Sequence, residues 1–310
     1  MDFFFNPRGI AVLGATAKEK KGGFSIIKNL MEGFQGNIYP VNPRYFEING
    51  LPCFATMDQV PDPVDMAIIF VPAPAAPSVV QACADRGIPG VIIQSAGFAE
   101  TGEKGKELQK QLAEISRRTG IRIWGPNCMG LMDVVHKKVF SFVTPSIWEE
   151  GLLPGDISLV VQSGMLSAGF LIDMMTRDKL GVSKACSIGN KMDVNECDIL
   201  EYLLADPDTA VVALYLESIH EGRRFFEICK GATKPVVVLQ GGKSEKGARA
   251  ALGHTASMAC NSAIMKGALA QAGVVQADDF RQMMDFSHTL SLFPKVPRRR
   301  PARIAVATFS

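Results

Sequence analysis

Short aliphatic and β-branched runs alternate with longer amphipathic segments along the whole chain. The runs lie at residues 9–14, 37–42, 65–72, 90–97, 121–127, 156–164, 184–190, 210–218, 235–242 and 274–279. Parallel strands that are buried on both faces form near-continuous apolar stretches, and a helical segment follows each of them. The pattern therefore predicts a doubly wound α/β architecture with enough strands for two parallel sheets.

Two breaks in this pattern divide the chain. The first is the less regular stretch 129–156, where we place a domain boundary that gives domains of residues 1–146 and 147–292. The second is 293-FPKVPRRRP-301, whose prolines prevent a helix or strand from continuing. The run 302-ARIAVATFS-310 reads as one more strand. We expect residues 293–310 to be a linker and the first strand of a third domain that is otherwise absent.

Composition and charge argue against several classes of protein. The 310 residues are 47% hydrophobic and 21% charged, which is typical of a globular protein, and the formal net charge is only +2. So small a charge argues against nucleic acid as a partner. No apolar run approaches the roughly 20 residues of a membrane-spanning helix, so no membrane partner is expected. The seven scattered cysteines form no C-x-x-C pair, so we expect reduced thiols, a cytoplasmic protein and no metal site.

In a doubly wound sheet, ligands bind at the carboxyl ends of the strands, so the residues after each strand are the candidate site. After the first strand, 14-GATAKEKKGG-23 favours a phosphate at a helix N-terminus, although it lacks G-x-G-x-x-G spacing. After the second, Asn42 and Arg44 stand where an NAD-binding protein carries an acidic residue. A ribose that bears a phosphate, as in NADP or coenzyme A, fits this basic group better. An arginine that only caps a loop gives the same pattern, so both interpretations of Arg44 stay open.

Three further strand ends of the first domain offer other contacts. Val71 and Pro72 present a flat apolar ledge that suits an extended arm such as pantetheine. The fourth and fifth strands end in small polar turns with free amides, Ser95-Ala96-Gly97 and Pro126-Asn127-Cys128. Ordinary α/β loops contain the same residue types, so these turns stay open as well.

The second domain contains the side chains with the most distinctive chemistry. Gln162-Ser163-Gly164 joins a strand to a helix, and we interpret it as an anion site because it lacks the G-x-S-x-G of a serine hydrolase. Glu217 ends an apolar strand, and His254 stands among small residues in 247-GARAALGHTASMAC-260. A phosphohistidine needs an exposed imidazole, a carboxylate on its other nitrogen and amides around the phosphoryl group. We predict that His254, Glu217 and the Gly164 helix start supply these parts; a loop histidine with no catalytic role is the alternative.

Taken in order, these motifs make the chain resemble the NDP-forming acyl-CoA synthetases, the ADP-forming acetate–CoA ligase group related to the succinyl-CoA synthetase α subunit. The resemblance covers essentially the whole chain, with the motifs NPRGIAVLGAT, IYPVNPR, IIFVPAP, IIQSAGFAE, WGPNCMG, VVQSGMLSAGF, SIGNKMDVNECDILEYL, YLESIHEGRRF, GGKSEKGARAALGHTAS and QAGVVQADD. It implies a CoA-binding Rossmann-like domain followed by a flavodoxin-like, succinyl-CoA synthetase-like domain, both built on parallel sheets.

The resemblance also assigns roles to the candidate residues. His254 matches the phosphorylated histidine, Glu217 its supporting carboxylate, and residues 162–164 a phosphate loop. Ala256 departs from the glycine that the family often has near the histidine. The residues implied near CoA are Gly14, Thr16, Val71, Pro72, Ser95, Ala96, Gly97, Pro126, Asn127 and Cys128, to which the strand-end argument adds Arg44.

The reaction that the resemblance implies is acyl-CoA + ADP + Pi ⇌ acid + CoA + ATP, through an acyl phosphate and a phosphohistidine. Coenzyme A and phosphate are thus expected ligands. Mg-ADP or Mg-ATP is expected on an ATP-grasp domain or β subunit, which nothing in this chain provides, and an oligomer is expected because the catalytic parts are split. No residue of the sequence identifies the carboxylic acid.

Two other functions stay open. The first is a CoA-binding regulatory module without ligase activity, because similar domains occur fused to acetyltransferases, where the histidine is frequently absent. The second is an NADP-dependent oxidoreductase, which explains Arg44 but gives His254 no role.

Overall fold

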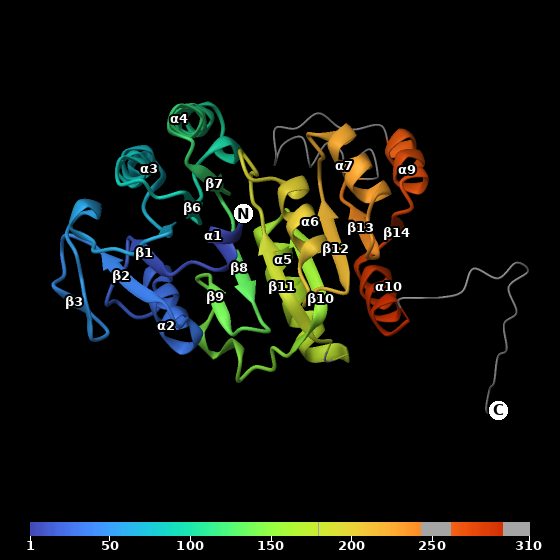
Figure 1. The fold of residues 1–310 in the computed structure, drawn as a ribbon, viewed down its shortest axis with the longest axis horizontal. Coiled ribbons are helices and arrows are strands. Elements are labelled where there is room, and N and C mark those ends of the chain that lie inside the picture. The colour runs from blue at the N-terminus through green and yellow to red at the C-terminus, as the bar shows by residue number, and fades with distance from the viewer. Residues whose placement is uncertain (179, 243–261, 294–310) are drawn as a thin grey trace, which may run out of the picture.

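The computed structural model describes residues 1–178, 180–242 and 262–293, which form two α/β domains side by side (Figure 1). The first sheet has the strand order β2-β1-β5-β6-β7, and all its strand pairs are parallel. The order changes direction between β1 and β5, which makes this the switch point where ligands bind in such sheets. The strands are β1 (Gly9–Leu13), β2 (Asn37–Val41), β5 (Met66–Ile69), β6 (Gly90–Ile93) and β7 (Arg122–Trp124), with a small hairpin of β3 (Glu47–Ile48) and β4 (Leu51–Pro52) beside them.

Helices cover both faces of this sheet. Residues of α2 (Gly22–Gly33) pack on one face, and residues of α3 (Ala76–Asp85) and α4 (Glu103–Thr119) pack on the other. Successive strand residues point to opposite faces, so both faces must be apolar when both are covered. Every residue of β1, β5 and β6 is accordingly buried, which explains the uninterrupted apolar runs in the sequence.

The second sheet has the order β14-β13-β12-β10-β11-β8-β9, and it is mixed, which corrects the expectation of a purely parallel sheet. Its parallel strands are β10 (Pro154–Val161), β11 (Val182–Ser187), β12 (Val211–Leu216), β13 (Val236–Gln240) and β14 (Val275–Ala277). The hairpin of β8 (Gly130–Asp133) and β9 (Lys138–Phe140) adds to β11 in antiparallel orientation. These strands are so short that their stretch lacks a recognisable pattern in the sequence. The boundary at residue 146 stays a prediction.

Two helix layers also enclose the second sheet. α6 (Glu196–Ala205), α7 (Gly222–Lys230) and α9 (Ser262–Gln271) pack on one face, and α5 (Gly164–Asp173) and α10 (Phe280–Leu292) pack on the other. The short helices are η1 (Met57–Gln59), η2 (Ala73–Ala75), η3 (Ala99–Thr101), η4 (Pro145–Ile147) and η5 (Met174–Asp178). All ten apolar runs form strands, so the predicted α/β fold class is confirmed.

A four-residue helix, α1 (Asp2–Phe5), helps to join the two domains. The ring of Phe4 lies 5.4 Å from Trp124 of the first sheet, and Phe5 stacks on Tyr202 of α6 at 3.7 Å. Trp124 donates its indole N–H to the carbonyl of Ser187 in the second sheet at 2.8 Å. Burying a phenylalanine side chain contributes about 1.5–3 kcal/mol, so this apolar junction is a substantial part of the interface. The sequence analysis did not identify it.

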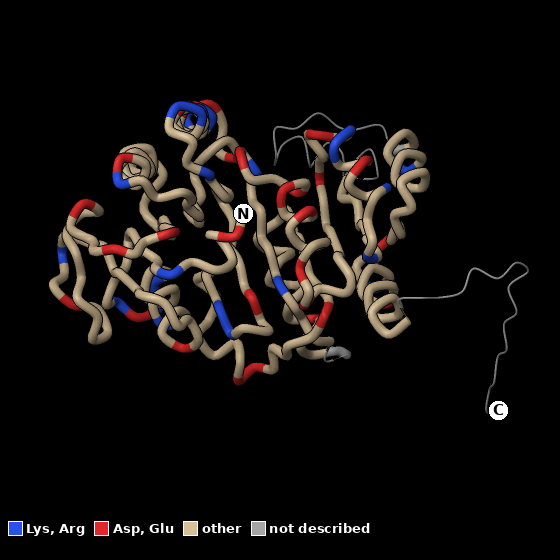
Figure 2. Tube along the Cα trace, in the orientation of Figure 1, with Lys and Arg blue, Asp and Glu red and all other residues tan. Residues whose placement is uncertain are grey.

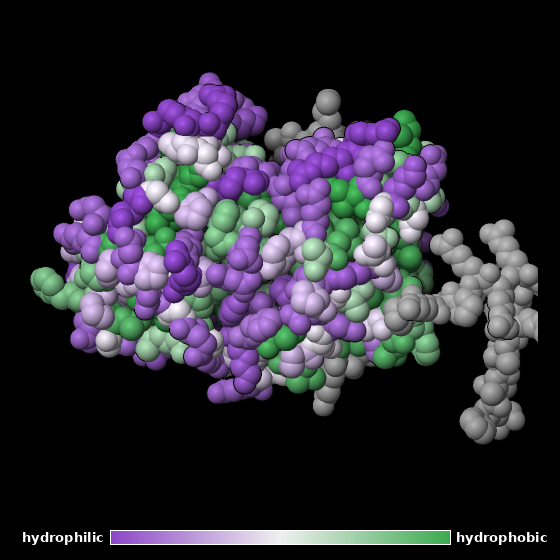
Figure 3. Space-filling view, viewed as in Figure 1, coloured by the Kyte–Doolittle hydropathy of each residue, from purple (hydrophilic) through white to green (hydrophobic). Residues whose placement is uncertain are grey.

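The surface agrees with the small net charge. Acidic and basic residues are interspersed over both domains (Figure 2), and the face in Figure 3 mixes apolar and polar residues. Among the helices of the described ranges, none has the length and apolar character needed to cross a membrane. The same ranges contain no group of three His, Cys, Asp or Glu residues that could hold a metal ion.

Candidate functional site

The turn after β1 lies at the switch point of the first sheet and leaves no room for side chains. Gly14 has φ +92°, and a Cβ atom there would lie 2.2 Å from the carbonyl oxygen of Phe70. A Cβ atom on Gly23, in the first turn of α2, would lie 2.3 Å from the Gly14 oxygen. Val71 and Pro72 follow directly after Phe70, and Pro72 is exposed. The backbone segments of this turn therefore pack directly against one another, which only glycine allows at these two positions.

The turn after β2 supports the loop after β1. Asn42 donates its side-chain amide to the carbonyl of Ala15 at 2.7 Å, and Thr16 and Tyr45 share a hydrogen bond between their hydroxyl oxygens at 3.0 Å. Arg44 donates its backbone N–H to the side-chain oxygen of Asn42, while its side chain is exposed. Arg44 thus lies at the rim of the switch point, where its guanidinium is accessible.

The turn after β6 contains a polar atom with an unmet hydrogen-bonding capacity. The hydroxyl oxygen of Ser95 is buried and has no hydrogen-bond partner within the described ranges. Ala96 is exposed, and Glu100 accepts hydrogen bonds from the backbone N–H groups of Gly97 and Phe98 at 2.6 and 3.0 Å. A buried polar group without a partner costs free energy, so Ser95 favours a ligand that reaches this turn.

The turn after β7 connects the first site to the second sheet. Asn127 donates its side-chain amide to Asn190 at 3.3 Å, and Asn190 donates to Glu100 at 2.7 Å. A Cβ atom on Gly189 would lie 2.3 Å from the carbonyl oxygen of Pro126. Burial alone would raise the pKa of Glu100, but hydrogen bonds from Asn190 and two backbone amides hold it below its usual value. Hydrogen bonds therefore join the loops that follow β6, β7 and β11.

Cys128 belongs to the same turn but offers no reactive thiolate. Its thiol is buried and donates to the carbonyl of Ile93 at 3.4 Å. Burial raises the pKa of the thiol to about 12. Cys128 therefore stays protonated at neutral pH, which excludes it as a nucleophile there.

In the second sheet, the loops after β10 and β12 meet at the switch point. The side-chain oxygen of Gln162 accepts the backbone N–H groups of Glu217 at 2.8 Å and Ser218 at 3.1 Å. Ser163 caps α5 by accepting the backbone N–H of Leu166 at 3.4 Å. The positive end of the α5 dipole thus lies beside the loop that contains Glu217, a position that suits an anion.

Met129 lies between the end of β11 and the start of α5. Its backbone N–H donates to the hydroxyl of Ser187 at the end of β11, at 3.0 Å. A Cβ atom on Gly164 would lie 3.6 Å from Cγ of Met129, which is ordinary contact distance. The residue that directly follows the turn expected at CoA therefore lies next to the helix start expected at phosphate.

A buried ion pair lies next to the loop that contains Glu217. Lys191 donates to Glu196 at 2.8 Å and also to the backbone carbonyl of Ser218, and both charged side chains are fully buried. Desolvation lowers the pKa of Lys191, although the negative charges of Glu196 and, more weakly, Glu217 oppose this. Desolvation raises the pKa of Tyr215 to about 12, with a further contribution from its charge contact and hydrogen bond to Glu217. Glu217 is thus fixed at both its backbone and its side chain.

Some sequence predictions fall elsewhere. His254 lies outside the described residues, so its distance to Glu217 stays a prediction. Asp193, noted in the sequence only as an acid near a helix start, accepts hydrogen bonds from Arg122 across the domain interface at 3.0 and 3.1 Å. Lys191 and Glu196 were missed because charged residues usually indicate a solvated surface. The only signal was their place after a strand, beside the Asn195-x-x-Asp198 capping box.

The comparisons with known proteins agree with this architecture. Residues 8–133 match the family model of the CoA binding domain, and residues 154–290 match the succinyl-CoA ligase like flavodoxin domain. The chain is 39% identical to the acetate–CoA ligase [ADP-forming] II subunit alpha of Pyrococcus furiosus over 99% of its own length and 65% of that protein. It is also 39% identical to the acetate–CoA ligase [ADP-forming] II of Archaeoglobus fulgidus, over 94% of this chain and 43% of that protein.

A solved structure gives the same result in three dimensions. It is the dinucleotide forming acetyl-coenzyme A synthetase 1 of Ca. Korarchaeum cryptofilum in complex with phosphate and ADP. The two chains superpose with a TM-score of 0.88 at 34% identity, over 94% of this chain and 62% of that one. The chain thus spans less than two thirds of the length of each of these three proteins. It is an ADP-forming acetate–CoA ligase alpha-subunit-like protein, which combines a CoA-binding domain with a succinyl-CoA ligase-like domain.

Proposed function

We propose that the chain is the CoA-binding and phosphohistidine-bearing part of an ADP-forming acyl-CoA synthetase. Together with an ATP-grasp domain or subunit, it would catalyse acyl-CoA + ADP + Pi ⇌ acid + CoA + ATP. The observation that carries the proposal is the position of Met129, which directly follows the turn expected at the thiol end of CoA and lies next to the α5 start expected at phosphate. Phosphate can attack a thioester only if the two are held close together.

The residues of the first domain fit CoA as a substrate. The turn at Gly14 lies at the switch point of the sheet, where a phosphate would bind, and the exposed Arg44 at the rim would supply a positive charge for the ribose phosphate. The hydroxyl of Ser95 is buried and has no partner among the described residues, so it can bond a polar group of the pantetheine arm. Val71 and Pro72 would form the apolar side of that channel.

The second domain would carry out the phosphoryl relay. A phosphate oxygen attacks the thioester carbonyl carbon, the C–S bond breaks, and CoA leaves as the thiolate, which gives an acyl phosphate. An imidazole nitrogen of His254 then attacks phosphorus, and the carboxylate of the acid leaves. Glu217 would hold the proton on the other imidazole nitrogen, and the amides of the Gly164 helix start would stabilise the phosphoryl charge.

The remaining parts of the proposal concern partners. Mg-ADP would bind the ATP-grasp unit, which receives the phosphoryl group from His254. We expect the complex to be an oligomer, because the relay joins two separate units. We also place it in the cytoplasm, since the six described cysteines are free thiols.

The test combines two variants with the reconstituted ATP-grasp partner. We expect ATP labelled in the γ-phosphate to leave acid-labile phosphate on the wild-type chain and none on His254→Asn. Calorimetry should show the same CoA affinity for both proteins, since the two sites use separate residues. We expect Glu217→Gln to lower the labelled yield at least about tenfold, because a general base or its orienting group contributes on that order.

Other results would point to other functions. Tight CoA binding with no labelled histidine under any condition would favour the regulatory module. Binding of NADPH tighter than CoA would favour the oxidoreductase. Loss of CoA binding in His254→Asn would contradict the separation of roles.

A further inference from the structure

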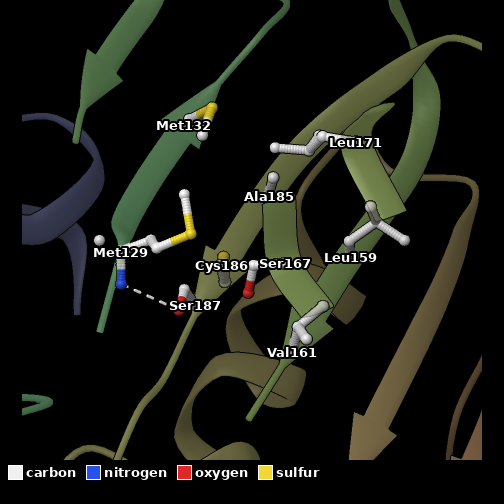
Figure 4. Close-up of a pocket in the computed structure, with 10 residues that line it drawn as sticks. Met129, Met132, Leu159, Val161, Ser167, Leu171, Ala185, Cys186 and Ser187 are labelled. Atoms are coloured by element: carbon white, nitrogen blue, oxygen red, sulfur yellow. Dashed lines mark hydrogen bonds between the residues drawn. The ribbon is translucent and has the colours of Figure 1, made fainter. Parts of the chain in front are cut away.

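We propose that a cavity between α5 and the strands β8, β10 and β11 holds the alkyl end of the acyl group, and that Leu171 and Ala185 determine how long this group can be. The inference rests on the proposed synthetase function. It goes further by assigning a specificity site, which neither the motifs nor the strand-end argument identifies. Figure 4 shows the cavity and the side chains that line it.

The cavity lies beside the residues that are expected to hold the reacting groups. In the proposed reaction, the acyl carbonyl lies between the CoA thiol and the attacking phosphate. Met129 directly follows the turn expected at CoA, lies next to Gly164 and also lines the cavity, and its side chain extends toward Ala185 and Cys186 (Figure 4). An acyl group held beside Met129 would therefore have this cavity as an adjacent apolar space.

The walls of the cavity are apolar. Leu171 of α5 faces Met132, Leu159 and Val161 of the sheet across it. Two serines complete the lining, but Ser187 accepts the Met129 N–H and Ser167 donates to the backbone carbonyl of Ser163 at 2.8 Å. None of the described residues that line the cavity is charged. A carboxylate at the far end of a substrate would therefore be desolvated there without a partner.

The size of the cavity limits the chain length. Its free space is about 10 Å³, which holds the centre of one water-sized group. A methyl group fits this space, whereas each added methylene must push against close-packed walls. The cavity thus selects unbranched monocarboxylic acids of two to three carbons over longer, aromatic or dicarboxylic acids.

The experiment measures kcat/KM of the complete enzyme, chain plus ATP-grasp partner, for acetate, propionate, butyrate and succinate. For the wild type we expect acetate to exceed butyrate at least about tenfold, since one methylene in an apolar pocket changes kcat/KM by 10-fold or more. Leu171→Ala enlarges the cavity and should raise the butyrate-to-acetate ratio about tenfold. Ala185→Val fills it and should lower the propionate-to-acetate ratio.

Leu152→Ala is the matched control. Leu152 is equally buried in the same core cluster but does not line the cavity, so its truncation should lower stability and leave the acid preference unchanged. CoA affinity, measured for every variant, reports whether the chain is folded. The inference is overturned if the enzyme is active but Leu171→Ala and Ala185→Val keep the wild-type preference, or if succinate is the best acid. Absence of activity with every acid, with CoA binding intact, would instead overturn the proposed function itself.

Discussion

Strand β11 has a buried lysine near each end, and the two lysines have different surroundings. Lys184, near the amino end, lies 2.8 Å from Asp206, 3.6 Å from Asp208 and 3.9 Å from Asp133. Lys191, just past the carboxyl end, has one carboxylate partner, Glu196, and uses a further donor on the backbone carbonyl of Ser218. Both are almost completely shielded from water, with side-chain exposures of 2% and 0%.

The Lys184 cluster is structural, whereas the Lys191 pair lies next to the candidate site. At the amino end, three carboxylates surround one lysine. This cluster joins β8, β11 and the loop before β12, at the end of β11 that is opposite the candidate site. At the carboxyl end, Lys191 joins the loops after β11 and β12, and the carbonyl it binds follows Glu217 directly. One strand thus contributes to stability at one end and to the position of a catalytic candidate at the other.

The largest expected effect comes from removing either lysine. Lys184→Met and Lys191→Met should each lower the free energy of unfolding by about 3–5 kcal/mol, because each leaves buried carboxylates without a counter-charge. Urea denaturation measures the loss. The exposed Lys110→Met is the control and should change stability by less than about 0.5 kcal/mol. Equal stability of all three variants would contradict the burial of the two clusters.

A second prediction concerns the tightly packed turn at Gly14, which follows β1 at the carboxyl end of the first sheet. Gly14→Ala should weaken CoA binding at least about tenfold, because its Cβ would lie 2.2 Å from the Phe70 oxygen at a φ of +92°. Gly50→Ala is matched in φ, at +81°, but has nothing within 4 Å of its Cβ. It should cost about 1–2 kcal/mol of stability and leave CoA affinity unchanged. Calorimetric titration of both variants with CoA tests the pair, and equal affinities would move CoA away from Gly14.

A double variant tests whether Lys191 positions the Glu217–Ser218 loop in addition to stabilising the fold. Lys191→Met with Glu196→Leu removes the charge pair together and should recover much of the stability lost in the single variant. The labelled phosphohistidine should still form severalfold more slowly, since Ser218 loses the donor that fixes its carbonyl. A double variant with the wild-type rate of labelling would reduce Lys191 to a structural residue.

The smallest expected effect is the pH response of Glu100. Because its pKa is lowered in the folded protein, it stabilises the fold above its ordinary value of 4.5, and this contribution is lost as the pH falls below that value. Glu100→Gln should therefore flatten the fall of Tm as the pH drops below about 4.5. The exposed Glu107→Gln should leave the profile as in the wild type. Parallel acid profiles for both variants would contradict the hydrogen bonds at Glu100.

The sequence predicts those features that depend on repeated local pattern. Strands buried on both faces are visible as apolar runs, and the strand-end rule led to Gly14 and to Gln162-Ser163-Gly164 before the fold was known. The β8–β9 hairpin was missed because strands of three or four residues carry no period. Lys191 was missed because burial of a charge depends on a partner that only tertiary structure supplies. The role of His254 could be predicted from its motif alone, since it lies outside the described residues.

The phenylalanines of α1 pack against both domains and couple them energetically. Phe5 packs against Tyr202 and Phe4 against Trp124, so either sheet taken alone would leave aromatic rings facing water. The core cluster that contains both rings runs without interruption from the first sheet into the second. Unfolding of one half therefore exposes apolar surface on the other, and we expect a single cooperative transition in which a ligand bound to the first sheet stabilises the second as well.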